Sequence, residues 1–260
     1  MILLLDAGNT RLKWCLLQQS RCSKMHDSAY NLSALNEITL AEKPEAVWIA
    51  SVVSPAQNRL LTQWVAQRWD VPLHWVKVQT QAFGVLNGYE QAQQLGVDRW
   101  LALLAARQKT SANVCVVDCG TAVTVDILDK NGHHKGGMIL PGLTMMAQSL
   151  GQRTHALSAS TNTLTKCAQI QQNSKRESNP KQQQYWGRNT QQCIEIGTVY
   201  AVSGAVMRLL NEVEQNTKMP VTCLLTGGDA KILYPYLPDT CHWVPELVLQ
   251  GIAVIAEKTS

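Results

Sequence analysis

The sequence predicts an α/β fold built from two copies of one structural unit, and two observations support this prediction. First, an apolar run that ends in Asp-x-Gly and is followed at once by a second strand-like run occurs twice, in residues 3–17 and 115–128. Second, strand and helix patterns alternate after each copy. Asp6 and Asp118 are separated by the same distance in sequence as Gly8 and Gly120. One fold unit has therefore been used twice.

The first half of the chain predicts a hairpin followed by alternating strands and helices. The hairpin turns at Gly8, because a glycine followed by small polar residues separates two apolar runs. Apolar runs and helical periodicity then predict a strand at 46–53, a helix at 60–69, a strand at 73–78 and a helix at 97–109.

The second half repeats this arrangement, with a hairpin that turns at Gly120. The later elements are a strand at 136–140, a helix at 195–216, a strand at 221–230 and a helix at 247–258. Residues 169–192 are rich in Gln, Asn, Ser and Lys, which is typical of a mobile surface segment. We expect two domains, at 1–110 and 111–260.

Charge and hydrophobicity exclude several classes of protein. The net charge of +4 and the pI of about 8.6 come from scattered basic residues, so we expect no nucleic-acid partner. Asp6 interrupts the opening apolar run, and no uninterrupted apolar segment reaches the length that spans a membrane. We therefore expect a cytoplasmic protein without membrane contact.

Cysteines and histidines give no metal-binding pattern. No Cys-x-x-Cys occurs, and five of the eight cysteines sit in apolar patterns, where reduced cysteine behaves as a small hydrophobic residue: Cys15, Cys115, Cys119, Cys193 and Cys223. Cys115 and Cys119 face one side of a strand but lack two further ligands at zinc spacing. His133 and His134 follow the turn signal Asn-Gly, so we expect both to be solvated at a strand edge.

The two hairpin turns suit phosphate. A glycine lets a ligand approach the backbone, and Asn9, Thr10 and Thr121 supply N–H and hydroxyl groups beside it. Asp6 and Asp118 would repel phosphate unless a cation lay between, so the pattern predicts phosphate together with a metal ion. Asp-x-Gly is also ordinary hairpin chemistry. Its occurrence twice favours the functional interpretation.

Residues 96–100, GVDRW, place Asp98 and Arg99 where a glycine gives way to a helix. The positive end of the helix dipole favours an ionised carboxylate there. Asp98 could accept the proton of a substrate hydroxyl while Arg99 neutralises an anionic group. The alternative is an acidic first-turn residue beside a surface arginine.

Three glycine-containing turns complete the candidates. Residues 136–142, GGMILPG, join a strand to a helix and offer a wall for a ligand or a second backbone. In residues 226–230, TGGDA, the glycines Gly227 and Gly228 could admit a nucleotide or form a plain turn between a strand and a helix. In residues 187–190, GRNT, Thr190 could cap the next helix or face a substrate.

Taken in order, DAGNTRLKW, GVDRW, DCGTAVTVD, GGMILPG, GRNT and TGGDA resemble the type III pantothenate kinases. The resemblance implies two ribonuclease-H-like domains of the actin, hexokinase and heat-shock chaperone ATPase superfamily, with a ligand cleft between them. It implies phosphorylation of pantothenate to 4′-phosphopantothenate by ATP, the first step of coenzyme A biosynthesis.

The resemblance also assigns roles to residues. Asp98 matches the proton acceptor, and Asp118 matches the ligand of a monovalent cation, K⁺ or NH₄⁺. Asp6 would direct Mg²⁺. Thr190 matches a substrate contact donated across the interface of a homodimer. The ATP-binding set would be Asp6, Ala7, Gly8, Asn9, Thr10, Arg11, Leu12, Lys13, Thr121, Gly227 and Gly228, and the pantothenate-binding set Tyr89, Gly96, Val97, Asp98, Arg99 and Thr190.

One departure from the family pattern concerns Ala92, which stands where a proline is usual, so a less rigid loop is expected after Tyr89. Other interpretations of the same fold are a transcriptional regulator, a sugar kinase and a chaperone-like ATPase. The presence of Asp6, Asp98 and Asp118 favours catalysis over regulation. The length of 260 residues leaves no room for a peptide-binding domain.

Overall fold

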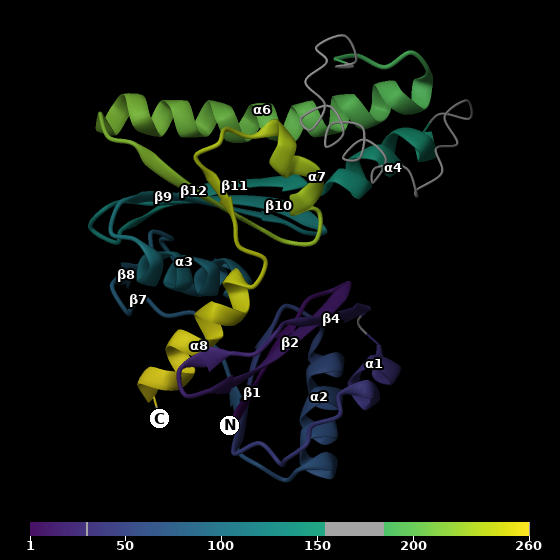
Figure 1. The fold of residues 1–260 in the computed structure, drawn as a ribbon, viewed down its shortest axis with the longest axis vertical. Coiled ribbons are helices and arrows are strands. Elements are labelled where there is room, and N and C mark those ends of the chain that lie inside the picture. Colours follow the sequence, from purple (N-terminus) through teal and green to yellow (C-terminus); the bar gives the residue numbers. More distant parts are fainter. Residues whose placement is uncertain (30, 154–184, 260) are drawn as a thin grey trace. The chain divides into compact units, whose positions relative to one another are not determined.

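The computed structural model describes residues 1–29, 31–153 and 185–259 (Figure 1). Contacts divide the chain into two compact units, which are described separately. Unit 1 comprises Met1–Ser111, Asn131–Gly136 and Glu246–Ser260, and unit 2 comprises Ala112–Lys130 and Gly137–Pro245.

The sheet of unit 1 has the strand order β3-β2-β1-β5-β6, with β4 also paired to β2. Strands β1 and β2 form the predicted hairpin, and β1 pairs in parallel with β5, which pairs in parallel with β6. Leu3, Leu5 and Leu12 are fully buried in its core. The strands are β1 Ile2–Ala7, β2 Arg11–Gln18, β3 Arg21–Cys22, β4 His26–Ala29, β5 Ala46–Ser51 and β6 Leu73–Trp75.

Helix α2, Pro55–Arg68, begins at a complete N-terminal cap. The Ser54 side chain accepts a hydrogen bond from the Gln57 N–H, and the Gln57 side chain accepts one from the Ser54 N–H, so both form a capping box. Pro55 occupies the first turn, where its missing N–H costs nothing. The remaining elements are α1 Leu32–Glu37, β7 Gln81–Ala82, β8 Val85–Leu86, the short 3₁₀ helix η1 Ala92–Gln94 and α3 Val97–Lys109.

Unit 2 repeats the topology of unit 1. Its sheet has the order β11-β10-β9-β12-β13, in which the antiparallel hairpin β9–β10 is followed by two parallel pairings, β9 with β12 and β12 with β13. The predicted α/β duplication is confirmed. The elements are β9 Asn113–Cys119, β10 Ala122–Leu128, β11 His134–Pro141, α4 Leu143–Arg153, α6 Thr190–Thr217, β12 Val221–Thr226, α7 Ala230–Leu233, the 3₁₀ helix η3 Tyr234–Tyr236 and β13 Cys241–Trp243.

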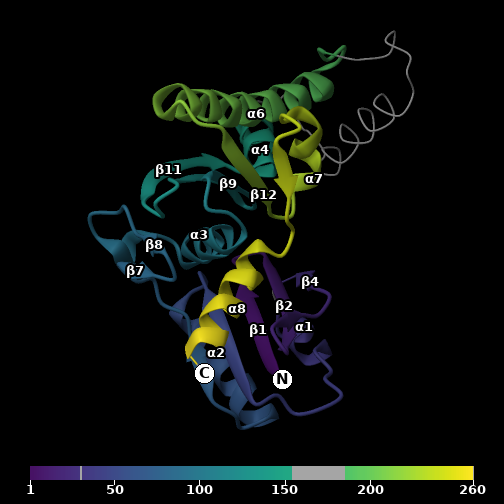
Figure 2. The ribbon, with the colours of Figure 1, turned by 60° about the vertical axis from the view of Figure 1, so that its left-hand side comes forward.

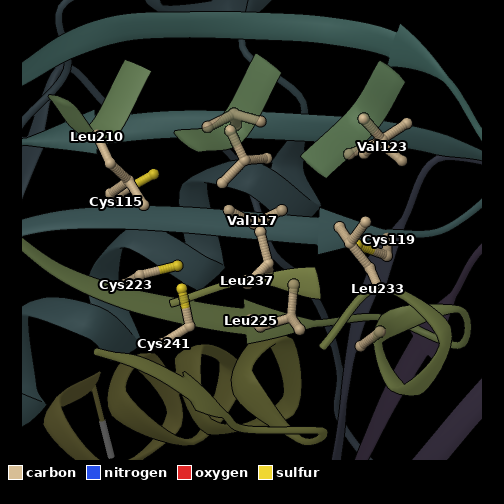
Figure 3. Close-up of a cluster of buried hydrophobic side chains, with 14 of the residues drawn as sticks. Cys115, Val117, Cys119, Val123, Leu210, Cys223, Leu225, Leu233, Leu237 and Cys241 are labelled. Atoms are coloured by element: carbon tan, nitrogen blue, oxygen red, sulfur yellow. The ribbon is translucent and has the colours of Figure 1, made fainter. Parts of the chain in front are cut away.

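The core of unit 2 contains several thiols. Figure 3 shows Cys115, Val117 and Cys119 of β9 among the buried side chains of one cluster, as the alternation of a strand requires. Burial raises the pKa of the Cys119 thiol well above its ordinary value, so this side chain is neutral and packs as a hydrophobic residue. Cys15 and Cys223 are also buried, as predicted, whereas Cys193 is exposed on α6. The prediction for Cys193 was wrong because that residue lies on the solvent side of the helix.

Helix α6 runs along the sheet of unit 2 (Figure 1), and Val199, Val202 and Val206 of α6 join the same core. Among the described residues, it is the one helix long and apolar enough to cross a membrane by length and composition. Since 44% of that apolar window is already buried in the protein, its hydrophobicity is that of a core helix. It begins at Thr190, five residues before the predicted start, so the end of the polar 169–192 stretch is helical; residues 169–184 lie outside the described part.

The last helix, α8 Leu247–Thr259, contacts α3, β1, β2 and β5 and belongs to unit 1. Figure 2 shows α8 lying across the sheet of unit 1. Helices α3 and α8 approach closely, because a Cβ on Gly251 would overlap the backbone of Leu101. The contact-based units therefore differ from the expected ranges of 1–110 and 111–260, since both α8 and residues 131–136 join the first half.

Candidate active site

The first hairpin turn of unit 1 connects two cross-strand neighbours of opposite charge. Asp6 on β1 lies directly opposite Lys13 on β2, so their side chains emerge on the same face of the sheet. The Gly8 N–H donates to the Arg11 carbonyl at 3.0 Å, which closes the turn. Asn9 and Thr10 are exposed at its tip. The turn thus presents a carboxylate, an ammonium group and two short polar side chains.

Three other residues predicted to contact ATP have side chains that already make contacts within the protein. Ala7 and Leu12 are fully buried in the core of unit 1, so a ligand can reach only their backbone groups. Arg11 Nε donates to Asp27 Oδ1 at 2.7 Å, and this hydrogen bond raises the pKa of the guanidinium further. Because the pair is exposed, it contributes little to stability and an anion could compete for Arg11.

The second hairpin turn, in unit 2, is held against another backbone segment. The Gly120 N–H donates to the Ala122 carbonyl at 3.0 Å, and the Gly142 N–H donates to the Thr121 carbonyl at 3.0 Å. A Cβ on Gly142 would overlap that same carbonyl. Gly142 therefore lies directly against a second backbone, whereas a Cβ on Gly136 would meet nothing within 4 Å.

The TGGDA turn lies beside Asp118, because β12 pairs in parallel with β9 and Thr226 is opposite Asp118. Gly227 has φ +94°, and a Cβ there would overlap the Cys119 carbonyl and lie 2.5 Å from Asp118 Oδ1. Only glycine fits both conditions. Gly228, in contrast, is exposed, and a Cβ on it would meet nothing within 4 Å. At this turn Gly227 is packed against the backbone of Cys119, whereas the space beside Gly228 is open.

Asp229 is a second carboxylate at this end of the sheet, and the sequence pattern alone did not single it out within TGGDA. Its N–H donates to the Cys119 carbonyl at 3.0 Å. Burial raises the pKa of its carboxyl, and Lys231 opposes that change. Asp118 and Asp229 both act electrostatically on Cys119. The two carboxylates therefore lie near one another in unit 2.

The GVDR segment forms the start of α3. Gly96 is the N-cap residue, and Asp98 lies in the first turn, where the helix dipole stabilises negative charge. Asp98 Oδ1 accepts a hydrogen bond from the Arg99 N–H at 2.8 Å. A Cβ on Gly96 would lie 2.5 Å from this oxygen, so glycine at this position permits the observed orientation of Asp98.

Arg99 is not a surface residue: only 6% of it is exposed. Its Nη1 donates to the Tyr89 hydroxyl at 2.7 Å, and its guanidinium lies 5.4 Å from the centre of the Tyr89 ring. Two of the residues predicted to bind pantothenate are thus in contact. Val97 is buried, so only its backbone is accessible to a ligand.

Thr190 is exposed at the first position of α6. The helix is capped by Asn189, whose side chain accepts a hydrogen bond from the Gln192 N–H at 2.9 Å. Thr190 therefore does not cap the helix, and the second use considered for it, a contact to substrate, stays a prediction.

We expect Gly96→Ala to lower kcat by roughly 10- to 100-fold, because its Cβ would push the Asp98 carboxylate out of position. Glycine is preferred to alanine at an N-cap position, so a small fall in the melting temperature is expected, too small to unfold the protein at the assay temperature. Steady-state kinetics together with a melting curve checks this. A variant with wild-type kcat would show that the orientation of Asp98 is unimportant.

Solved structures share this architecture. A protein described as a Baf family transcriptional activator from Campylobacter jejuni aligns with a TM-score of 0.61 at 18% identity, over 99% of this chain and 98% of that one. A 2-dehydro-3-deoxygalactonokinase homologue from Sinorhizobium meliloti aligns with a TM-score of 0.53 at 13% identity, covering 99% and 96%. The chain thus has the two-domain ribonuclease-H-like fold of the actin-like ATPases and sugar kinases.

Sequence comparison narrows this class to one family. The profile of the type III pantothenate kinases matches residues 2–212. The type III pantothenate kinase of Azoarcus sp. is 36% identical over 266 residues, which covers 98% of this chain and 90% of the relative. That of Nitrosococcus oceani is 30% identical over 270 residues, covering 100% and 95%. The chain belongs to the type III pantothenate kinase family.

Proposed function

We propose that this protein transfers the γ-phosphoryl group of ATP to the terminal hydroxyl of pantothenate, which gives 4′-phosphopantothenate in the first step of coenzyme A biosynthesis. Family membership supports the reaction. The observation that carries the assignment of residues is the GVDR segment, in which a carboxylate in the first turn of α3 precedes an arginine that is bonded to Tyr89.

Asp98 is the proposed proton acceptor. A carboxylate is a weak base, so it takes the hydroxyl proton late, as the bond between oxygen and phosphorus forms. Its hydrogen bond with the Arg99 N–H holds one oxygen in place. Tyr89, Arg99 and the backbone of Gly96 and Val97 would bind pantothenate, with Arg99 facing its carboxylate.

The turn from Asp6 to Lys13 is the proposed phosphate site, with Thr121, Gly227 and Gly228 as further ATP contacts. Backbone N–H groups and the Lys13 ammonium would hold the charge that develops on the transferred phosphoryl group. Gly228 is the more open of the two glycines, since a Cβ there would meet nothing within 4 Å, whereas the space beside Gly227 is filled by Cys119 and Asp118 of the protein itself. Precise placement of the two substrates provides most of the rate.

The carboxylates near the two hairpin turns have the chemistry needed to bind a divalent and a monovalent cation. Asp6 and Asp118 supply the hard oxygen donors that Mg²⁺ and K⁺ require, and each is the residue before the last in its strand, next to a hairpin turn. No cluster of three or more His, Cys, Asp or Glu side chains suited to a metal occurs in the described part of the chain, so phosphate, water or backbone oxygens would complete the coordination. Mg²⁺, when bound, neutralises phosphate charge.

The proposal extends to the assembly and location of the enzyme. The active form would be a cytoplasmic homodimer, with Thr190 of one protomer reaching the substrate of the other. Thr190 is exposed beside two exposed aromatic residues, Tyr185 and Trp186, which suits a position at an interface.

The test is formation of ADP by the purified protein with Mg²⁺, with and without pantothenate, in K⁺ or in Na⁺. We expect turnover to need pantothenate and to fall at least about tenfold when Na⁺ replaces K⁺, because a cation site of fixed size distinguishes the two ions. Asp118→Asn should abolish the dependence on K⁺, whereas Asp239→Asn, which alters an exposed carboxylate of unit 2, should retain it.

Absence of turnover in folded, dimeric protein would instead favour another hydroxyl acceptor or a regulator on the same fold. Turnover that is equal in K⁺ and Na⁺ would remove the cation role of Asp118 and leave the kinase assignment intact.

A further inference from the structure

The first residue of β11, His134, which follows the turn from β10, is a buried histidine that packs against the predicted pantothenate-binding segment. His134 is only 3% exposed, whereas its neighbour His133 is exposed. The expectation that both are solvated is therefore confirmed for His133 and wrong for His134. The reason is that residues 131–136 leave the rest of the hairpin and pack in unit 1.

The turn is docked in unit 1 by close backbone contacts. The Leu86 N–H donates to the Gly132 carbonyl at 2.8 Å. A Cβ on Gly132 would overlap the Gly84 carbonyl, and a Cβ on Gly88 would overlap the His134 carbonyl. Glycine at these two positions allows backbones to meet without intervening side chains. The His134 ring consequently has a defined place.

That place is against the face of Tyr89. The ring centroids of Tyr89 and His134 are 5.8 Å apart, and the ring planes are 15° from parallel. Tyr89 in turn holds Arg99, because its hydroxyl accepts the 2.7 Å hydrogen bond from Arg99 Nη1. A contact chain therefore leads from His134 through Tyr89 to Arg99.

The backbone of this segment is held separately from the ring. Asn87 Oδ1 accepts a hydrogen bond from the Tyr89 N–H at 3.0 Å, and Asn87 Nδ2 donates to the Ala92 carbonyl at 3.2 Å. These bonds fix the position of the Tyr89 backbone but do not determine its side-chain torsion angles. The stack with His134 restricts those torsions, and with them the direction of the hydroxyl.

We propose that His134 is a positioning residue for the acceptor substrate, which holds the Tyr89 ring so that its hydroxyl keeps Arg99 aimed at the anionic end of that substrate. This inference rests on the proposed function for the role of Arg99. The contact chain from His134 to Arg99 is a claim about the protein itself and can be tested without turnover.

The experiment compares His134→Ala, His134→Phe and the matched control His133→Ala with the wild type. We expect His134→Ala to raise KM and the calorimetric Kd for pantothenate roughly five- to tenfold, which is the effect expected for one lost aromatic stack. Since the ring acts on acceptor binding alone, kcat and KM for ATP should stay near wild-type values, whereas the melting temperature should fall, because alanine leaves a cavity where a buried ring packed. His134→Phe keeps a stacking ring and should restore pantothenate binding, and His133→Ala should have no effect.

Crystal structures of the wild type, His134→Ala and His134→Phe supply the second readout. The bond between Tyr89 and Arg99 should be lost or disordered in the alanine variant and kept in the phenylalanine variant. An unchanged bond, an unchanged KM, or an equal rise in KM in both variants would overturn the positioning role. If the wild type does not phosphorylate pantothenate, the proposed function fails, and the crystal structures still decide whether His134 holds Tyr89 and Arg99.

Discussion

Asp98→Asn is expected to lower kcat by about 10³-fold while affinity for ATP stays within about twofold of the wild-type value. Asparagine has the size of aspartate and keeps an oxygen that can accept the Arg99 N–H bond, but its amide cannot take up the proton of the substrate hydroxyl. The loss should therefore fall on the chemical step. Single-turnover kinetics and calorimetric titration of a non-hydrolysable ATP analogue measure the two quantities separately.

The matched control is Glu42→Gln, which neutralises an exposed carboxylate of unit 1 that has no place in the proposed site. It should leave both quantities unchanged. Equal losses of turnover and ATP affinity in Asp98→Asn would show that Asp98 supports the nucleotide site and would remove its assignment as the base.

Gly227→Ala is expected to cost about 2 to 3 kcal/mol of folding free energy and to lower the melting temperature by roughly 5 to 10 °C. Two effects add: alanine is strained at φ +94°, and its Cβ would overlap the Cys119 carbonyl and crowd Asp118 Oδ1. Turnover should fall more than stability alone explains, because Asp118 is the proposed ligand of the monovalent cation. Melting curves and kinetics over a range of K⁺ concentration measure both effects.

Gly228→Ala provides the control at the next position, where a Cβ meets nothing within 4 Å. It should alter the melting temperature by no more than about 2 °C, the range of an unstrained surface change. Similar losses in both variants would mean that glycine is needed at this turn for a reason other than the room beside Asp118.

The elements that the sequence predicted correctly are those with long, regular patterns. The two hairpins follow from alternating apolar runs around Gly8 and Gly120, and α3 follows from its helical periodicity. Strands β3, β7 and β8 have only two residues each, which is too short for any period to appear. Helix α2 begins at Pro55 because of the capping box at Ser54, five residues before its apolar pattern becomes clear.

The residues of the candidate site also fall into a group that the sequence predicts and a group that it does not. Its glycines and aspartates could be found because each lies at or next to the end of a strand or the start of a helix in the chain. The burial of Arg99 and His134 could not, since both depend on tertiary contacts with Tyr89, ten residues before Arg99 and far from His134 in the sequence. A polar side chain gives no local signal that a partner will bury it. The placement of α8 in unit 1 could not be predicted either, because it depends on contacts between segments that are far apart in the sequence.

The return of α8 to unit 1 also sets the order in which the protein can mature during synthesis. The strands of the first sheet leave the ribosome early, but the helix that covers them comes from the last residues of the chain. At ordinary ribosomal elongation rates the intervening residues of unit 2 take on the order of ten seconds to translate. During that interval the nascent first sheet exposes apolar surface that α8 later covers.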